Sequence, residues 1–145
     1  MSKGVRIVIP GQPVPKERPR ATRRGHIYTP KKTKDYEELV KQIYKAKYRN
    51  AIFEKNVPLS MDIIAYFGIP KSDSKAKRKK KSNGEILPTI KADADNICKI
   101  IMDALNGVAY MDDKQITDIH IFKRYSDNTP RVDVMISEVN GNVES

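Results

Sequence analysis

The chain has very little of what marks an exported or membrane-spanning protein. Its 145 residues contain one cysteine, Cys98, so no internal disulfide can form, and this fits a reducing compartment. No apolar run approaches the roughly 18–20 residues that a membrane span needs, and the N-terminus lacks an apolar signal segment. We therefore expect a cytoplasmic protein that has no membrane partner.

Several familiar catalytic and binding motifs are also absent. The sequence has no Ser-His-Asp constellation and no Gly-rich phosphate loop. His26 and His120 lie far apart without a cysteine partner, so no zinc site is expected. An EF-hand calcium loop starting at Asp93 fails, because Cys98 replaces the required glycine and Ala104 the required glutamate. Cys98 itself is expected to be a packed thiol, not a nucleophile.

Acidic residues are the minority charge. The chain has 18 Asp and Glu against 28 Lys and Arg, a formal net charge of +10. Its length and its 39% hydrophobic content fit a single domain, residues 1–145, with a modest core. Most of the excess positive charge lies in two basic loops at about 10–30 and 71–85. A basic protein attracts polyanions, above all nucleic acid.

Hydrophobic periodicity predicts an α+β fold, a small mixed β-sheet with flanking helices. The predicted elements are a strand at 5–9, a helix at about 33–49, a strand at 61–67, a helix from Asp95 or Asn96 to about 105, and strands at 116–122 and 132–136.

Within this pattern, Leu39, Ile43 and Ala46 are predicted to form the buried stripe of the first helix. Five prolines in residues 10–30 predict a long loop there. Residues 71–85 are expected to form a short helix or to stay mobile.

Carboxylates gather at one place on this basic chain. Asp93 and Asp95 share a face only if the chain is extended there, and a helix starting just after them would place Lys99 on nearly the same side. An extended run over 108–111 would return Asp112 or Asp113 to the helix start. Like charges do not cluster for stability, so a hard divalent cation, Mg²⁺ or Mn²⁺, is expected among them.

Plainer interpretations exist for each of these residues. Asp93 and Asp95 would otherwise only cap the helix, the Asp112-Asp113 pair would form a turn, and Lys99 would be a solvated charge. A cap needs one acid, and three converge here, so the metal site is favoured. Asp103, two turns further along the helix, is expected to be a surface residue or to lie just outside the ligand set.

The order of these residues resembles a known family. Asp-x-Asp-Asn, a lysine four residues after the second aspartate, Asp-Ala-Leu-Asn-Gly, and Tyr-x-Asp-Asp-x-Gln-Ile are similar to the RusA-type Holliday junction resolvases, both cellular and prophage-borne. The lead-in PGQPVPKERPR and RRGHIYTPKKTKDYE also resembles that of Gram-positive and phage members. The resemblance spans about residues 5–137, and its motif at 93–115 is the specific part.

The resemblance implies a Mg²⁺-dependent endonuclease in which Mn²⁺ can substitute. Asp93, Asp95 and Asp113 would be metal ligands, and Lys99 would complete the catalytic set. The partner would be branched DNA, especially four-way junctions, cut in two strands by a symmetric homodimer. A nuclease for flaps or forks, a non-catalytic DNA-binding module with a structural metal, and a protein-binding adaptor remain as alternatives.

The cations of the two basic loops are the candidate DNA contacts. Their alternative role is a solvated, solubilising surface, and Tyr28 beside them either stacks on an unpaired base or packs in the core. The predicted DNA-binding residues are Lys16, Arg18, Arg20, Arg23, Arg24, Lys77, Arg78 and Lys79.

Overall fold

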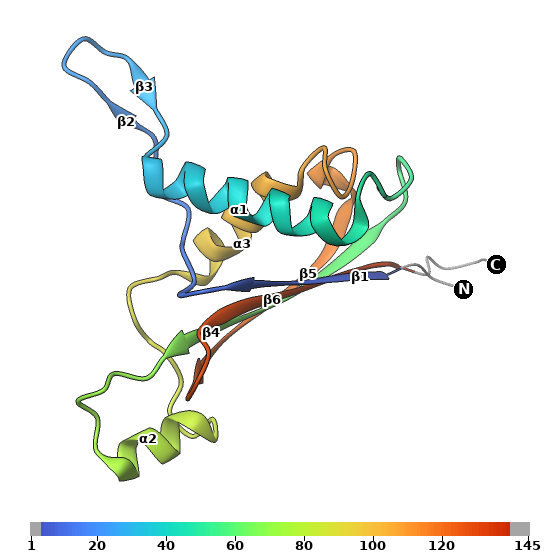
Figure 1. Cartoon of the computed structure of the whole chain (residues 1–145). Coiled ribbons are helices and arrows are strands. Elements are labelled where there is room, and N and C mark those ends of the chain that lie inside the picture. The colour runs from blue at the N-terminus through green and yellow to red at the C-terminus, as the bar shows by residue number, and fades with distance from the viewer. Residues whose placement is uncertain (1–3, 140–145) are drawn as a thin grey trace.

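A four-stranded sheet carries two helices on one of its faces, as the computed structural model of the chain shows (Figure 1). The structure describes residues 4–139. In chain order the elements are β1 (Gly4–Pro10), β2 (Arg20–Ala21), β3 (Ile27–Tyr28), α1 (Lys31–Tyr48), β4 (Leu59–Gly68), α2 (Lys75–Ser82), α3 (Ala94–Leu105), the 3₁₀ turn η1 (Asp113–Gln115), β5 (Ile116–Ser126) and β6 (Arg131–Glu138).

The sheet is mixed, with strand order β1-β6-β4-β5. β4 pairs in parallel with β5 and antiparallel with β6, and β1 pairs antiparallel with β6. Parallel neighbours need a long crossover, and the chain between β4 and β5 supplies it with α2 and α3. The predicted α+β class with a mixed sheet and flanking helices is confirmed, while the predicted homodimer stays a prediction.

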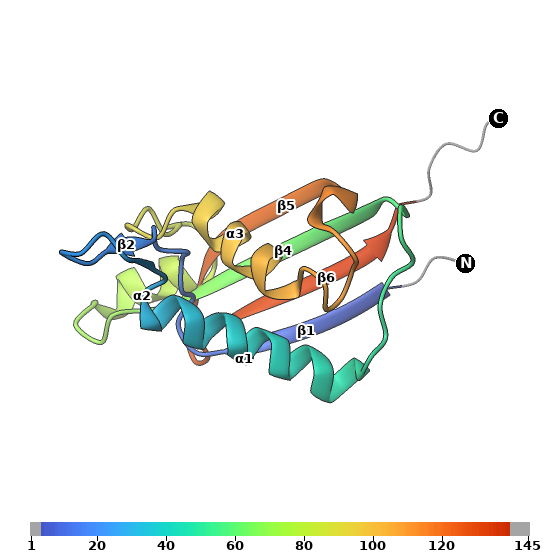
Figure 2. The same ribbon diagram turned by 90° about the horizontal axis from the view of Figure 1, so that it is seen from above.

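The core lies between one face of the sheet and the helices α1 and α3, which cross above the strands (Figure 2). Along β4 the side chains alternate, and Met61, Ile63 and Ala65 are fully buried. Val40 of α1 and Ile100 of α3 meet them from the helical layer, also fully buried. Each large apolar side chain buried in this way stabilises the fold by about 1.5–3 kcal/mol.

The buried face of α1 is only partly the predicted one. Of the predicted stripe, Ile43 is half-buried and packs against the core, whereas Leu39 and Ala46 are exposed. The fully packed hydrophobic side chains of the helix are those of Tyr36, Val40 and Tyr44. The two tyrosines have large apolar rings spaced with Val40 at intervals of four, and these rings give the stripe that packs on the core.

The predicted loop at 10–30 is wrong for residues 20–28, where β2 and β3 form a hairpin that projects from the body (Figure 1). The prolines that predicted a loop lie at Pro10–Pro19 and at Pro30, so none interrupts the hairpin. Gly25, at φ 83°, makes the tight turn that the two strands need.

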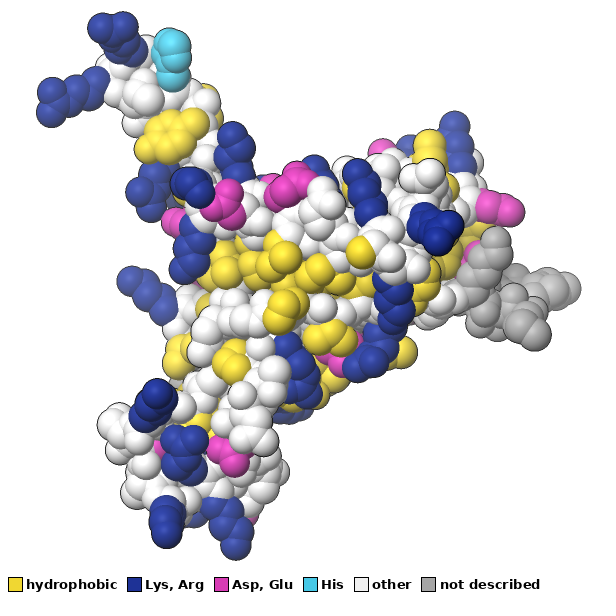
Figure 3. Space-filling view, in the orientation of Figure 1, with side chains coloured by type: hydrophobic (Ala, Val, Ile, Leu, Met, Phe, Trp, Pro, Cys, Tyr) yellow, Lys and Arg dark blue, Asp and Glu magenta, His cyan; other side chains and the backbone are white. Residues whose placement is uncertain are grey.

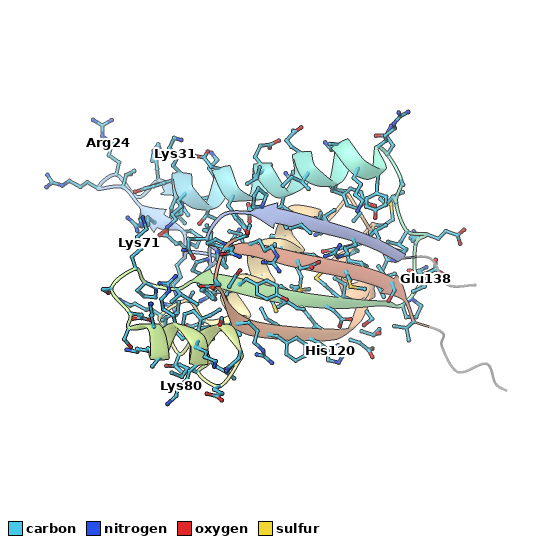
Figure 4. All side chains as sticks on the ribbon, turned by 60° about the horizontal axis from the view of Figure 1, so that its bottom comes forward. Arg24, Lys31, Lys71, Lys80, His120 and Glu138 are labelled. Atoms are coloured by element: carbon cyan, nitrogen blue, oxygen red, sulfur yellow. The ribbon has the colours of Figure 1, made fainter. Side chains whose placement is uncertain are left out.

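The helical alternative for residues 71–85 is confirmed by α2, which begins after Ser74, whose hydroxyl accepts the Lys77 backbone N–H at 3.2 Å. α2 lies beyond the far face of the sheet from α1 and α3, at one end of the strands (Figures 1 and 4). Across residues 4–139, none of the helices has the length and apolar character that crossing a membrane requires.

Candidate active site

Two aspartates stand where helix α3 begins. Asp93 is the N-cap residue, with extended backbone at φ −68° and ψ 140°, but its carboxylate accepts no capping hydrogen bond. Asp95 lies in the first turn, where its Oδ1 accepts the backbone N–H of Asn96 at 3.0 Å. Both residues are exposed. An N-cap aspartate ordinarily accepts an N–H of the first turn, so the Asp93 carboxylate is left available to another partner.

The helix begins slightly earlier than predicted. Ala94 is its first residue, so Asp95 is already helical, and the prediction that Asp93 and Asp95 share one extended face is wrong. The cause is local: Asp93 is itself a good N-cap residue, and Ala94 has the highest helix propensity of any residue.

One side of α3 is polar and the other is core. Asp95, Lys99 and Asp103 follow one another at intervals of four, so they lie on one side of the helix. Lys99 is exposed, and the Asp103 side chain is 34% exposed. Ile97 and Ile100 are 1% and 0% exposed on the opposite side, which confirms the predicted core face. The polar side therefore rests on a rigidly packed helix.

Asp112 holds the turn that positions Asp113. The Asp112 carboxylate accepts the backbone N–H of Lys114 at 3.0 Å, while the side-chain oxygen of Gln115 accepts the backbone N–H groups of Met111 and Asp112 at 3.0 and 3.2 Å. This reciprocal arrangement is a capping box. The Asp112 carboxylate is thus used to cap this turn. The Asp113 carboxylate, the predicted metal ligand, takes no part in the capping box.

Gln115 anchors this turn to the body of the protein. Its side chain is buried, and its Nε2 donates to the backbone oxygens of Glu54 and Val57 at 2.8 and 3.1 Å. Sequence reasoning gave Gln115 no role of its own. The signal that could have found it was the spacing Asp-x-x-Gln, which is the spacing of a capping box.

Asp113 lies in a negative environment. Partial burial raises its pKa above the ordinary aspartate value, and the neighbouring Asp112 carboxyl and the charge of Asp103 raise it further. The pKa of Asp112 is lowered, chiefly by the hydrogen bond from the Lys114 backbone. Cys98 is buried, which confirms the predicted packed thiol, and burial raises the pKa of this thiol to about 11, with a contribution from Asp95.

The route that was predicted to carry Asp113 back to the helix start is different. Instead of an extended run over 108–111, the chain turns tightly after α3: Gly107 has φ 77° and its N–H donates to the Tyr110 carbonyl at 2.8 Å. After this turn Asp113 lies within the electrostatic reach of Asp103, whose charge contributes to raising the pKa of Asp113. Within residues 4–139 no three His, Cys, Asp or Glu side chains are grouped to hold one metal ion.

Lys16 bridges the two helices beside these acids. Its Nζ lies 2.6 Å from Glu37 of α1 and 3.2 Å from Asp103 of α3, and its backbone N–H donates to the Asn96 carbonyl at 2.9 Å. Burial lowers the pKa of Lys16, but the bonds to Glu37 and Asp103 outweigh burial and raise it overall. Of the predicted DNA contacts, Lys16 is therefore one that protein carboxylates already neutralise.

The other predicted DNA contacts lie on the two projecting parts of the molecule. On the N-terminal segment, Arg20 pairs with Glu17 at 3.2 Å. On α2, the guanidinium of Arg78 pairs with Asp127 at 3.3 Å and donates to the Pro70 carbonyl at 2.9 Å. The predicted contacts that are exposed and form no ion pair with another described residue are Arg18, Arg23, Arg24, Lys77 and Lys79.

Lys81, which was not predicted to have a role, packs α2 against the sheet. Lys81 is 7% exposed, its Nζ lies 2.6 Å from an Asp73 oxygen, and it sits 4.7 Å from the ring centroid of Tyr125 on β5. The Lys81 hydrogen bond lowers the pKa of Asp73. These contacts turn the outer cations of α2 away from the body, where they form one of the positive surfaces seen in Figure 3.

Comparison with known proteins supports a single family. The family model described as "Endodeoxyribonuclease RusA" matches residues 10–137. A protein of Bacillus subtilis (strain 168), YqaN, which is described as uncharacterized, is 38% identical over 140 residues, covering 93% of this chain and 96% of that protein. The matched residues 10–137 include the acids at 93–95 and 112–113 and the basic regions at about 10–30 and 71–85.

Proposed function

Because the chain belongs to the RusA family of endodeoxyribonucleases, we propose that it cleaves four-way DNA junctions in a Mg²⁺-dependent reaction that cuts two strands symmetrically. The observation that carries this proposal is the family match over residues 10–137. The charge distribution agrees with it, since the exposed cations suit DNA phosphates and the acids at α3 suit a divalent ion.

The proposed metal ligands are Asp93, Asp95 and Asp113, assigned from their positions in the family motif. Their donor chemistry fits Mg²⁺, which prefers oxygen ligands and keeps several waters. The Asp93 carboxylate, which caps nothing, is free for this role. The side chains do not form a three-ligand cluster within residues 4–139. Three carboxylates repel one another, so their convergence requires a cation between them.

A bound divalent ion would supply an activated water and stabilise charge on the phosphate. The chain's own groups have separate tasks. Lys99 would neutralise a nonbridging phosphate oxygen, where charge grows during hydrolysis. Its exposure on the same side of α3 as Asp95 supports this role. The hydrogen bonds of Asp112 and Gln115 fix the backbone that presents Asp113. The packed face of α3 keeps Asp95 and Lys99 on a rigid support.

The proposed assembly is a symmetric homodimer. A four-way junction has approximate two-fold symmetry, and one active site cannot cut both opposed strands together. A two-fold dimer presents two equivalent sites to two equivalent strands.

The test is cleavage of a synthetic four-way junction, beside duplex, flap, fork and single-stranded substrates of matched sequence, with and without Mg²⁺. Cuts at symmetric positions in the junction, dependent on Mg²⁺ and absent from the duplex, support the proposal. Faster cleavage of flaps or forks than of the junction would make it a nuclease for other branched DNA. Tight salt-sensitive binding without cleavage would make it a binding module.

A further inference from the structure

The hairpin β2–β3 carries an unusual pair of exposed apolar residues. Ile27 is 78% exposed, more than any other large hydrophobic residue in the described chain, and Tyr28 is 47% exposed. Scattered exposed hydrophobic residues are normal and need no explanation by themselves. The setting of these two is what distinguishes them, because they stand on a projecting hairpin among arginines (Figures 1 and 3).

Three hydrogen bonds close the tip of the hairpin. The Thr22 N–H donates to the His26 carbonyl at 2.8 Å, the Gly25 N–H to the Thr22 carbonyl at 2.9 Å, and the His26 N–H to the Thr22 hydroxyl at 3.1 Å. Pro19 precedes β2 and Pro30 follows Thr29 after β3, which restricts the backbone at both roots of the hairpin. A preorganised arm loses little conformational entropy when it binds.

The strand register separates its two faces. Ala21 pairs with Ile27, and Arg20 pairs with Tyr28, and residues paired across strands share a face. One face is thus apolar, and the other places an aromatic ring beside a guanidinium. Around the hairpin, Arg18, Arg23 and Arg24 form no ion pair with another described residue. They remain available for an anionic partner. Arg24 points away from the body at the end of the arm (Figure 4).

We propose that this hairpin is a wedge that enters the branch point of DNA, with Ile27 inserted against an unstacked base and Tyr28 stacked on another. This inference rests on the proposed function and names the part of the chain that detects the branch. The outside of a regular duplex presents phosphates, which suit the arginines but offer nothing to Ile27. At a branch point the stacking of bases is interrupted, so an apolar side chain and a ring find base faces there.

The experiment places the fluorescent base 2-aminopurine at the crossover of a four-way junction, and in a second junction in the middle of an arm. Unstacking raises the fluorescence of this base. The full-length protein is added without Mg²⁺, so that binding is read without cutting. The expected result is a rise at the crossover and none within the arm. Anisotropy of a labelled junction measures affinity in parallel.

Ile27→Ser is expected to lose most of the rise at the crossover, while Ile27→Met, which keeps the apolar bulk, retains it. Tyr28→Ala is expected to weaken junction binding by roughly 5- to 150-fold, the loss expected for one stacked base, and Tyr28→Phe to keep it. The matched control is Leu87→Ser, which removes a side chain that is 45% exposed elsewhere in the chain. Leu87→Ser is expected to match the wild type.

An unchanged signal in Ile27→Ser, or an equal rise within the arm, would overturn the wedge. So would Ile27-dependent sedimentation with vesicles of phosphatidylglycerol combined with an unaffected junction signal, since the arm would then be a membrane contact. A crossover signal without cleavage in Mg²⁺ would leave the wedge standing and refute the nuclease. Cleavage of the junction in Mg²⁺ without any crossover signal would refute the wedge and leave the nuclease standing.

Discussion

The ammonium group of Lys16 lies 3.2 Å from a carboxylate oxygen of Asp103, and the same ammonium lies 2.6 Å from Glu37. One lysine of the proline-rich segment thus joins α1 to α3 across the polar side of the acidic helix. The charge of Asp103, which Lys16 partly offsets, is one that raises the pKa of Asp113. The segment before the hairpin is therefore electrostatically connected to the proposed catalytic acids.

Replacing Lys16 by Met is expected to destabilise the protein. Glu37 and Asp103 would lose their shared partner, and leaving partly buried charged groups unpaired costs about 1–3 kcal/mol of unfolding free energy. Urea denaturation at pH 7 measures this. The control is Lys34→Met, which removes an exposed lysine of α1. Equal stability of both variants would contradict the bridging role.

The same ion pairs predict a pH dependence. The pKa of Lys16 is raised in the folded protein, so its stabilisation is fully present below the unfolded lysine value of about 10.4 and is lost as pH rises through the folded value. The stability difference between wild type and Lys16→Met should stay constant from pH 7 to 9 and shrink above pH 10. Denaturation series at these pH values test the sign.

Asp112 and Asp113 are expected to respond in opposite directions. The pKa of Asp113 is raised, so its ionised form disfavours folding at neutral pH, and Asp113→Asn should stabilise the protein by roughly 0.5 kcal/mol, a small value because solvent screens this carboxylate. That gain in stability should vanish as pH falls below the ordinary aspartate pKa.

The pKa of Asp112 is lowered, so Asp112→Ala should destabilise the protein at pH 7, and this loss of stability should fade on acidification. Denaturation at pH 7 and at pH 3, which lies below the ordinary aspartate pKa of about 3.9, compares the two variants.

Gln115 is expected to matter for both stability and activity. Gln115→Met removes two hydrogen bonds to the backbone oxygens of Glu54 and Val57 and two to the turn, which should cost about 1–3 kcal/mol. Because the turn presents Asp113, junction cleavage should fall more than junction binding. Gln42→Met, at an exposed position of α1, is the control. A Gln115→Met variant that loses stability but cuts at the wild-type rate would show that Gln115 does not support cleavage through the position of Asp113.

The arginines of the hairpin are expected to act through phosphates. Arg23→Gln and Arg24→Gln should each lower the slope of the logarithm of junction affinity against the logarithm of salt concentration by about 1, the value for one lost phosphate contact. Titrations between 50 and 200 mM KCl measure this slope. The control is Arg6→Gln, because Arg6 is already paired with Asp133 on the sheet. Unchanged slopes for both hairpin variants would argue against DNA contact there.

The fold was predictable wherever periodicity was long. The strand predicted at 61–67 and the helix after Asp95 both form, each extended by a few residues, because their apolar patterns are strong. The hairpin was missed because two-residue strands leave almost no pattern, and the nearby prolines pointed to a loop. The face of α1 was only partly predicted because Tyr36 and Tyr44 were not counted as core residues.

The positions of the candidate residues along α3 were predictable, but the position of Asp113 relative to them was not. Spacing alone placed Asp95 and Lys99 on one side of a helix. The path of Asp113 depends on the tight turn at Gly107 and on the anchoring of Gln115 to Glu54, which are contacts distant in sequence or specific to one backbone geometry. No local pattern contains that information.

The most direct test of the central claim is junction cleavage in Mg²⁺ by Asp93→Asn, Asp95→Asn and Asp113→Asn, measured beside junction affinity. Each variant is expected to lose more than about 100-fold in cleavage rate, since even outer partners of a metal site are worth 10–100-fold, while affinity for the junction stays near that of the wild type. The control, Asp118→Asn, changes an exposed acid on β5 and should cut normally. Wild-type cleavage by any of the three variants would contradict the claim that these aspartates together hold the ion.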